Sequence, residues 1–296
     1  MLTRRLFMAA SLFFATSAGC KRTSQGPAAN SELPFGEALR RLETAAQGKL
    51  GVYVIDTASG REFGHRADER FSMLSTFKLL ASAYVLARVD RAEESLPRRV
   101  QYTRQDLVDW SPVTEKHLEQ GELSLEELCH AAMTTSDNTA ANLILRSFGG
   151  PPALTRFVRT LGDDVTRTDR FETELNTPSN QEPLDTTTPR AMARTIHRLV
   201  LGDVLSPKSR EILQSWLLAN TTGLKRLRAG LPASWKLGEK TGTTPRATHD
   251  VGVAWPPAHA PVVVTTYLAS DTAANDVREQ TLAEVGRLLP ALIRAT

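Results

Sequence analysis

A serine and a lysine that could act together, Ser75 and Lys78, lie three positions apart near the start of a segment with helical apolar spacing. On a helix, side chains at this separation share one face and come within interaction distance. A serine hydroxyl is a weak nucleophile, and an adjacent amine can activate it if burial and a cationic neighbour such as Lys240 lower the pKa of that amine. The same spacing is common in ordinary helices, so the pair alone does not establish a site.

Two further patches carry polar groups suited to acyl transfer. Ser136-Asp137-Asn138 lies between two helical patterns, where it could equally cap a helix. Lys240-Thr241-Gly242-Thr243 ends a strand-like run, where its lysine could equally protect the edge of a sheet. In that patch, Gly242 would allow another backbone or a ligand to approach closely.

A long stretch without helical or strand periodicity carries Glu172 and Asn176 and continues to Asp185. A loop of this length in a compact domain is usually functional or ordered by its own contacts. Arg170 and Asp185 could close the neck of this loop with an ion pair. Either residue could instead be a solvated surface charge that contributes little.

The elements that must position these patches follow a simple order along the chain. A helical pattern begins near Phe35 and is followed by strand-like runs at 50–56 and 61–65. From residue 72 to about 219 the apolar patterns are almost wholly helical. Three strand-like runs and an amphipathic terminal helix to Ile293 come last, the runs lying near 234–240, 250–255 and 262–269.

Strands at both ends with helices between predict an α/β fold of the α+β two-lobe kind. We expect an antiparallel sheet of about five strands, formed by both terminal segments and flanked by helices, with an inserted all-helical lobe and the active site in the groove between the lobes. The predicted catalytic domain is single and spans 35–296. Its sheet lobe covers about 35–66 and 220–296, and its helical lobe covers about 67–219.

The first twenty residues are typical of an export signal, with Arg4-Arg5 followed by a largely apolar stretch from Leu6 to Ala18. That stretch is shorter than the roughly 20 residues that span a bilayer. The signal resembles the twin-arginine type, and Ala18-Gly19-Cys20 resembles a lipoprotein attachment box, although Ser17 stands where leucine is usual. We expect an exported, periplasmic protein with a flexible tether at 21–34 and a lipid anchor on Cys20, the alternative being ordinary peptidase cleavage nearby.

Composition is that of an ordinary soluble globular protein, with 41% hydrophobic and 23% charged residues. The formal net charge of +3 includes Arg4 and Arg5 of the predicted signal, so it gives no argument for nucleic acid as a partner. If Cys20 carries lipid, Cys129 has no disulfide partner and is expected to be a small buried residue in a helix. The six histidines are scattered and form no His-x-His-x-Asp cluster, so neither a metal nor a cofactor is expected.

Taken together and in order, these patches resemble the three signatures of the class A serine β-lactamases, Ser-x-x-Lys, Ser-Asp-Asn and Lys-Thr-Gly. The resemblance extends from about Phe35 to the C-terminus and includes the segments 110–117 and 140–143 and the loop with Glu172. It implies a monomer that hydrolyses the β-lactam amide of penicillin and cephalosporin antibiotics through an acyl-serine and so confers antibiotic resistance. The implied partners are the antibiotic and a catalytic water.

Carried over position by position, the resemblance makes Ser75 the nucleophile and the backbone amides of Ser75 and Thr243 the oxyanion hole. Ser136 would deliver a proton to the leaving lactam nitrogen. Lys240 would orient Ser136 and stabilise the substrate carboxylate together with Thr241 and Thr243.

The remaining roles concern the water and the substrate side chain. Glu172 and Asn176 would hold the hydrolytic water, with the carboxylate as general base for deacylation. Whether Glu172 or Lys78 takes the proton of the nucleophile during acylation stays open. Asn138 would bind the amide side chain of the antibiotic, and Trp110 would form a wall of the cleft.

Two departures from the family pattern bear on substrate range. No arginine stands at the usual place on the strand after Lys-Thr-Gly, near Thr248 and His249, whereas Arg226 matches an alternative arginine of some members, including carbapenem-hydrolysing ones. Those carbapenemases pair cysteines at places occupied here by Leu74 and Thr244. Carbapenem hydrolysis is therefore not predicted.

Two rival functions share the three signatures: a penicillin-binding peptidase of the cell wall, and a sensor that stays acylated by the antibiotic. Both share the acylation step, but the peptidase normally lacks the loop with a deacylating carboxylate. Glu172 and Asn176 therefore favour the hydrolase.

Overall fold

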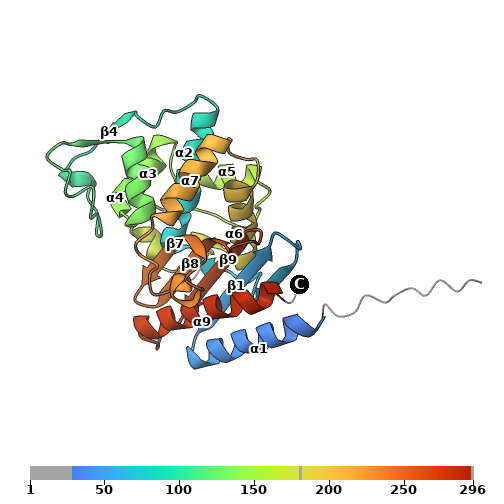
Figure 1. Ribbon diagram of the computed structural model, residues 1–296. Helices are drawn as coiled ribbons and strands as arrows, with labels where there is room; N and C mark the ends of the chain where they lie inside the picture. The colour runs from blue at the N-terminus through green and yellow to red at the C-terminus, as the bar shows by residue number, and fades with distance from the viewer. Residues whose placement is uncertain (1–28, 180–181, 295–296) are drawn as a thin grey trace, which may run out of the picture.

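Five antiparallel strands form the central sheet, in the order β2-β1-β9-β8-β7 (Figure 1). The computed structural model describes residues 29–179 and 182–294, so the predicted export signal and Cys20 lie outside the described residues. The strands come from both ends of the chain, as predicted: β1 Lys49–Asp56, β2 Glu62–His65, β7 Lys236–Thr244, β8 Ala247–Trp255 and β9 Val262–Ala269.

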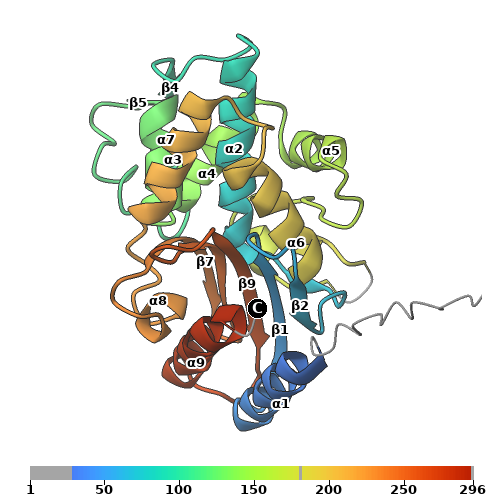
Figure 2. The same ribbon diagram turned by 45° about the vertical axis from the view of Figure 1, so that its right-hand side comes forward.

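Two terminal helices, α1 (Ala29–Ala45) and α9 (Asn275–Arg294), cover one face of this sheet (Figures 1 and 2). Between them and the strands lies a core that includes Leu39, Val52 and Leu289, all fully buried. Burial of each such side chain stabilises the fold by about 1.5–3 kcal/mol. Helix α1 begins at Ala29 and contains Pro34, so it takes in the end of the segment 21–34 in which the sequence predicts a tether.

Helices of the second lobe pack around α2 (Phe77–Asp90), as Figure 2 shows. Ten of the 14 residues of α2 are buried, among them the polar Lys78 and Ser82, as expected of a helix at the centre of a lobe. Cys129 is a buried free thiol in α3, as predicted. The other helices are α3 Leu125–Thr134, α4 Asn138–Ser147, α5 Pro151–Thr160, α6 Pro189–Ile196, α7 Pro207–Leu218 and the short α8 Leu227–Gly230.

The predicted all-helical composition of this lobe is wrong in detail, because two short strand pairs lie within it. Strand β3 (Phe71–Ser72) pairs with β6 (Thr186–Thr187), and β4 (Arg99–Gln101) pairs with β5 (Glu122–Ser124). Each strand has only two or three residues. Alternation of period two needs about four residues to be recognised, so no sequence pattern marks them.

Candidate active site

Ser75 lies in a single 3-10 turn, Leu74–Thr76, that leads directly into α2. The turn is held by Thr76, whose Oγ1 donates to the Met73 carbonyl at 2.7 Å. One turn later, Lys78 Nζ donates to Ser75 Oγ at 2.8 Å, which confirms that the two side chains share a face. A nucleophile and an amine are thus in direct contact at the start of a buried helix.

The Lys78 ammonium is fully buried and lies among several acceptors. Besides Ser75, it donates to the Ser136 carbonyl at 2.8 Å and to Asn138 Oδ1 at 2.5 Å, and it forms an ion pair with Glu172 Oε1 at 3.1 Å. Burial lowers the pKa of Lys78, although the carboxylate of Glu172 acts in the opposite direction. The amine can therefore give up a proton more readily than an exposed lysine.

Ser136-Asp137-Asn138 forms both a helix cap and a wall of the site. Asp137 is the N-cap of α4, with Oδ1 accepting from the Ala140 amide at 2.8 Å, which bears out the capping alternative. Ser136, at φ 62°, turns its hydroxyl toward two amines. Its Oγ accepts from Lys78 at 3.3 Å and from Lys240 at 3.1 Å, which leaves the hydroxyl hydrogen free to donate.

The second half of β7 carries the Lys-Thr-Gly-Thr patch along the edge of the sheet next to the serine turn. A Cβ at Gly242 would lie 2.9 Å from Leu74 Cβ and 3.4 Å from the Ser75 nitrogen, so the glycine is what allows the strand to approach. Lys240 is fully buried. Burial, together with the nearby charges of Lys78 and Arg226, brings the pKa of Lys240 well below its usual range.

The loop that carries Glu172 brings this carboxylate against Ser75. Glu172 Oε1 accepts from Ser75 Oγ at 3.2 Å, and its Oε2 accepts from Asn176 Nδ2 at 2.6 Å. The predicted neck is confirmed, with Arg170 Nε and Asp185 Oδ2 at 2.6 Å. The carboxylate therefore has one oxygen toward the serine and one held by an amide.

The sequence gives no role to Asn142, which fixes the backbone of Glu172. Asn142 Nδ2 donates to the Glu172 carbonyl and Asn142 Oδ1 accepts from the Glu172 amide, both at 2.8 Å. Asn142 follows Asn138 by one helical turn on α4, so its place on the same helix face is the sequence feature that indicates a role in the site.

The sequence likewise gives no role to Thr222, whose Oγ1 lies 2.5 Å from Thr241 Oγ1.

Arg226 lies buried beneath β7 rather than extending into solvent. Its guanidinium donates to the carbonyls of Gly242 at 3.2 Å and His249 at 2.8 Å, and to Thr243 Oγ1 at 2.7 Å. A planar cation with several donors can hold the ends of two strands and orient a hydroxyl at once. Its charge is partly balanced by Glu279, at 3.4 Å.

Trp110 and Asn138 also line the site. Trp110 is 66% exposed, and its Nε1 donates to the Thr135 carbonyl at 3.0 Å. Asn138 Nδ2 donates to the Asp109 carbonyl at 2.7 Å, which leaves its second amide hydrogen free.

These side chains meet in one cleft of about 510 Å³. Nine residues line it: Ser75, Trp110, Ser136, Asn138, Asn176, Thr222, Arg226, Thr241 and Thr243. Lys78, Lys240 and Glu172 are buried directly behind this lining, in contact with Ser75 or Ser136. The cleft thus combines a nucleophile, two amines, a carboxylate and a polar strand edge.

Within residues 29–179 and 182–294, no group of three or more histidine, cysteine or acidic side chains is arranged to hold a metal ion. None of the helices described for this chain is long and apolar enough to cross a membrane.

Comparison with known proteins identifies the family. The model of the β-lactamase enzyme family matches residues 34–293. The β-lactamase of Streptomyces albus G is 49% identical over 281 residues, which cover 92% of this chain and 89% of that protein. β-Lactamase L2 of Stenotrophomonas maltophilia is 44% identical over 305 residues, which cover 99% of this chain and 100% of the relative. The structure of an ancestral class A β-lactamase is 55% identical in sequence and superposes with a TM-score of 0.85. The match covers 88% of this chain and 100% of the ancestral chain. The chain therefore belongs to the β-lactamase enzyme family and is a class A serine β-lactamase, a hydrolase.

Proposed function

We propose that this protein hydrolyses the β-lactam amide of penicillins and cephalosporins in two half-reactions, acylation of Ser75 followed by hydrolysis of the acyl-serine. The position of Glu172 carries this proposal, because its carboxylate lies 3.2 Å from Ser75 Oγ and is held at 2.6 Å by Asn176. A base so placed serves the second half-reaction, whereas a peptidase normally lacks a loop with this carboxylate and a sensor stays acylated. Loss of the intact antibiotic is what confers resistance.

In the first half-reaction, Ser75 Oγ attacks the lactam carbonyl carbon and loses its proton to a neighbouring base. Lys78 Nζ and Glu172 Oε1 are both within hydrogen-bonding distance of that oxygen, at 2.8 and 3.2 Å, so both routes are chemically open. The backbone amides of Ser75 and Thr243 then stabilise the tetrahedral oxyanion. The close approach of β7 at Gly242 supports this pairing of amides, since it brings the strand against the serine turn.

When the carbon–nitrogen bond breaks, Ser136 gives its free hydroxyl hydrogen to the lactam nitrogen. Its oxygen accepts from both Lys78 and Lys240, so a proton lost to the nitrogen can be replaced from either amine. This arrangement supports proton delivery without a histidine.

The carboxylate that penicillins and cephalosporins carry binds beside Ser136 on the edge of β7. Lys240 supplies the charge, and the hydroxyls of Thr241 and Thr243 supply hydrogen bonds. Arg226 orients Thr243, to which it donates at 2.7 Å, and adds positive potential from beneath the strand. On the opposite wall Asn138 binds the amide side chain, and Trp110 covers it.

In the second half-reaction, a water held by Glu172 and Asn176 attacks the acyl carbon while Glu172 takes its proton. General-base assistance of this kind contributes about 10²- to 10⁴-fold in rate. The ester bond to Ser75 then breaks, and Ser75 Oγ takes back a proton from Glu172, which the attacking water had protonated.

Turnover tests the proposal against the peptidase and the sensor. The purified protein should hydrolyse a chromogenic cephalosporin over many cycles, and Ser75→Ala should be inactive. One equivalent of product per protein molecule, with a stable adduct and no further release, would instead identify a peptidase or sensor. The matched Ser82→Ala variant, altered at a buried serine on α2, should keep activity.

The proposal extends to the place of action. Residues 1–20 would direct export to the periplasm, and Cys20 would carry a lipid that anchors a monomer to the membrane. Incorporation of labelled fatty acid into the chain, and its loss in Cys20→Ser, tests the anchor. Release of the unsubstituted protein into the soluble periplasmic fraction without label would refute it, and light scattering of the purified protein tests the monomer.

A further inference from the structure

Two fully buried carboxyl groups, those of Glu239 and Asp250, lie on the strands that form the polar edge of the cleft. Glu239 precedes Thr241 by two residues on β7, and Asp250 on β8 is the cross-strand partner of Thr241. Residues so placed share one face of a sheet, so both acids lie on the face of Thr241, which lines the cleft. No step of the proposed mechanism uses either acid.

The two carboxyl groups hydrogen-bond to each other, which requires that one of them carry a proton. Glu239 Oε2 and Asp250 Oδ1 have no other donor in the described part of the chain, so one proton between these oxygens satisfies both. Burial raises the pKa of each acid, and repulsion from Glu239 raises the pKa of Asp250 further. The pair therefore carries a single negative charge rather than two.

The other oxygens of the pair hold the two residues that follow Arg226. Glu239 Oε1 accepts from Arg228 Nε at 2.9 Å, and Asp250 Oδ2 accepts from the Leu227 amide at 3.2 Å. Hydrogen bonds that involve a charged group are the stronger ones, and these lie in the interior of the protein. The pair therefore fastens the chain after Arg226 to the sheet.

The chain before Arg226 rests on the same pair. A Cβ at Gly223 would overlap the Glu239 carboxyl, so the backbone there lies directly against it. The Arg226 amide in turn donates to the Gly223 carbonyl at 2.9 Å. A separation of the two acids would therefore displace Arg226 from both sides.

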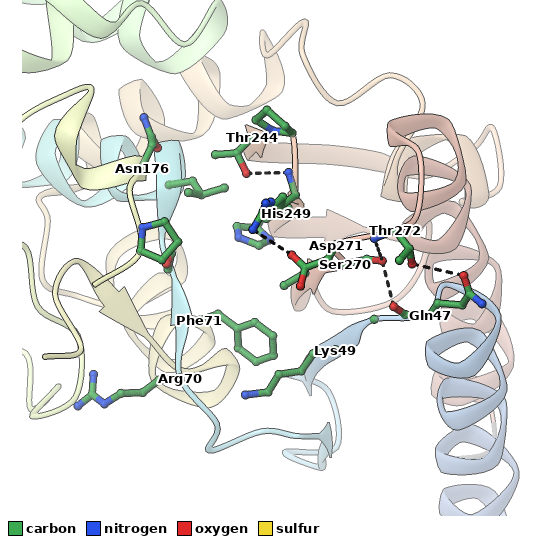
Figure 3. Close-up of a pocket in the computed structure, with 18 residues that line it drawn as sticks. Gln47, Lys49, Arg70, Phe71, Asn176, Thr244, His249, Ser270, Asp271 and Thr272 are labelled. Carbon is green, nitrogen blue, oxygen red and sulfur yellow. Dashed lines mark hydrogen bonds and ion pairs between the residues drawn. The ribbon is translucent and has the colours of Figure 1, made fainter. Parts of the chain in front are cut away.

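The strand ends that Arg226 holds have little packing on their far side. A cavity of about 830 Å³ borders the end of β7 and the start of β8, and Figure 3 shows Thr244 and His249 on its wall. Arg226 holds these ends by donating to the carbonyls of Gly242 and His249, at 3.2 and 2.8 Å. The place of Arg226 therefore decides where this edge of the cleft lies.

We propose that Glu239 and Asp250 are positioning residues for the site that binds the carboxylate of the antibiotic. They act through Arg226, which orients the Thr243 hydroxyl. Their shared proton keeps the two acids in contact, and their single negative charge leaves Arg226 and Arg228 with an excess of positive charge beside the cleft. This inference deepens the proposed hydrolysis and rests on it.

Amide substitutions test the shared proton. The amide nitrogen in Glu239→Gln can donate to Asp250, and that in Asp250→Asn can donate to Glu239, so each single change should raise KM for benzylpenicillin by less than about threefold. In the double variant each amide must turn its oxygen toward Arg228 or Leu227, which leaves two nitrogens facing each other without an acceptor. KM should then rise roughly tenfold or more, while kcat changes little.

A matched control and a second variant accompany these changes. Asp56→Asn, at a fully buried acid of β1 that does not line the cleft, should leave KM unchanged. Arg228→Gln removes the donor to Glu239 from a partly exposed position, so the variant should fold. Its KM should exceed by roughly threefold or more that of Lys225→Gln, which removes the same charge from an exposed position three residues earlier.

A spectroscopic signature tests the pair in variants that fold. Carbon-13 spectra of protein labelled at its aspartate and glutamate carboxyls should show a protonated carboxyl at neutral pH, and this signal should be lost in Glu239→Gln and in Asp250→Asn. If the double variant does not fold, these spectra and Arg228→Gln decide the question.

Several results would overturn the inference. These are a double variant whose KM is the product of the two single effects, a fall in kcat in place of a rise in KM, the absence of a protonated carboxyl, or equal KM for Arg228→Gln and Lys225→Gln. Absence of turnover by the unsubstituted protein would instead refute the proposed hydrolysis, so the two failures are distinguishable.

Discussion

Gly242→Ala is expected to damage catalysis through a short displacement of one strand. The added methyl would lie 2.9 Å from Leu74 Cβ and 3.2 Å from the Met73 carbonyl, whereas ordinary contacts begin at 3.4 Å. Relief of the closer contact requires β7 to move by about 0.5 Å away from the serine turn, because a packed interior has little free space to absorb the overlap. The displacement falls on the two amides proposed to form the oxyanion hole.

A displacement of this size matters because catalytic groups act within narrow geometric limits. Complete loss of an oxyanion donor costs about 10²- to 10³-fold, and a misplacement of 1 Å can cost about 10²-fold. We therefore expect kcat for a chromogenic cephalosporin to fall roughly 10- to 100-fold in Gly242→Ala. The free energy of unfolding should fall by about 1–3 kcal/mol, as is usual for an overpacked site.

Gly238→Ala is the matched control for this prediction. Gly238 lies on the same strand, and its added methyl would come 3.0 Å from Leu217 Cβ and 3.1 Å from Trp255, so the overlap is similar but remote from the cleft. Urea denaturation should show comparable losses of stability for both variants. If kcat falls equally in both, or in neither, the close approach at Gly242 does not serve the reaction and the reasoning is refuted.

Two further changes test other parts of the site and fold. Asn142→Ala removes both hydrogen bonds to the Glu172 backbone and should slow deacylation more than acylation, so a product burst should appear in rapid-mixing kinetics; equal slowing of both steps would count against it. Asp250 and Glu239 are both fully buried and interact with each other. Burial, together with repulsion from Glu239, raises the pKa of Asp250, and burial also raises the pKa of Glu239. Because the folded state keeps a proton that the unfolded state releases, stability should fall as pH rises above the ordinary carboxyl pKa of about 4, with a slope of about 1.4 kcal/mol per pH unit for one proton. In urea denaturation from pH 4 to 7, Asp250→Asn should flatten that decline, and an unchanged slope would show that Asp250 does not keep the extra proton in the folded state.

Much of the site could be predicted because its parts are local in sequence. Ser75 and Lys78 lie one helical turn apart, so their contact follows from helix geometry once the helix is recognised. The neck between Arg170 and Asp185 follows from opposite charges at the two ends of one loop. The five-stranded sheet follows from apolar runs at both ends of the chain.

What escaped prediction depends on contacts between distant segments. Arg226 donates to the carbonyls of two neighbouring strands, and nothing in its own neighbourhood of the sequence indicates that it is buried. His249 Nδ1 accepts from the Leu268 amide, a contact that arises only when β8 and β9 pair. Helix α1 continues through Pro34, and its packing against the sheet and α9 is a tertiary contact that no local pattern indicates.

The most direct test of the two-step mechanism is the fate of the adduct in Glu172→Gln. Glutamine keeps the size of the side chain and a hydrogen-bonding partner for Asn176, but it cannot take a proton from water. Intact mass and peptide mapping after mixing with a penicillin should show an acyl group on Ser75 that persists, with deacylation slowed by about 10²-fold or more relative to the unsubstituted protein. An adduct that clears at the unsubstituted rate, or one carried by a residue other than Ser75, would contradict the proposed roles of Glu172 and Ser75.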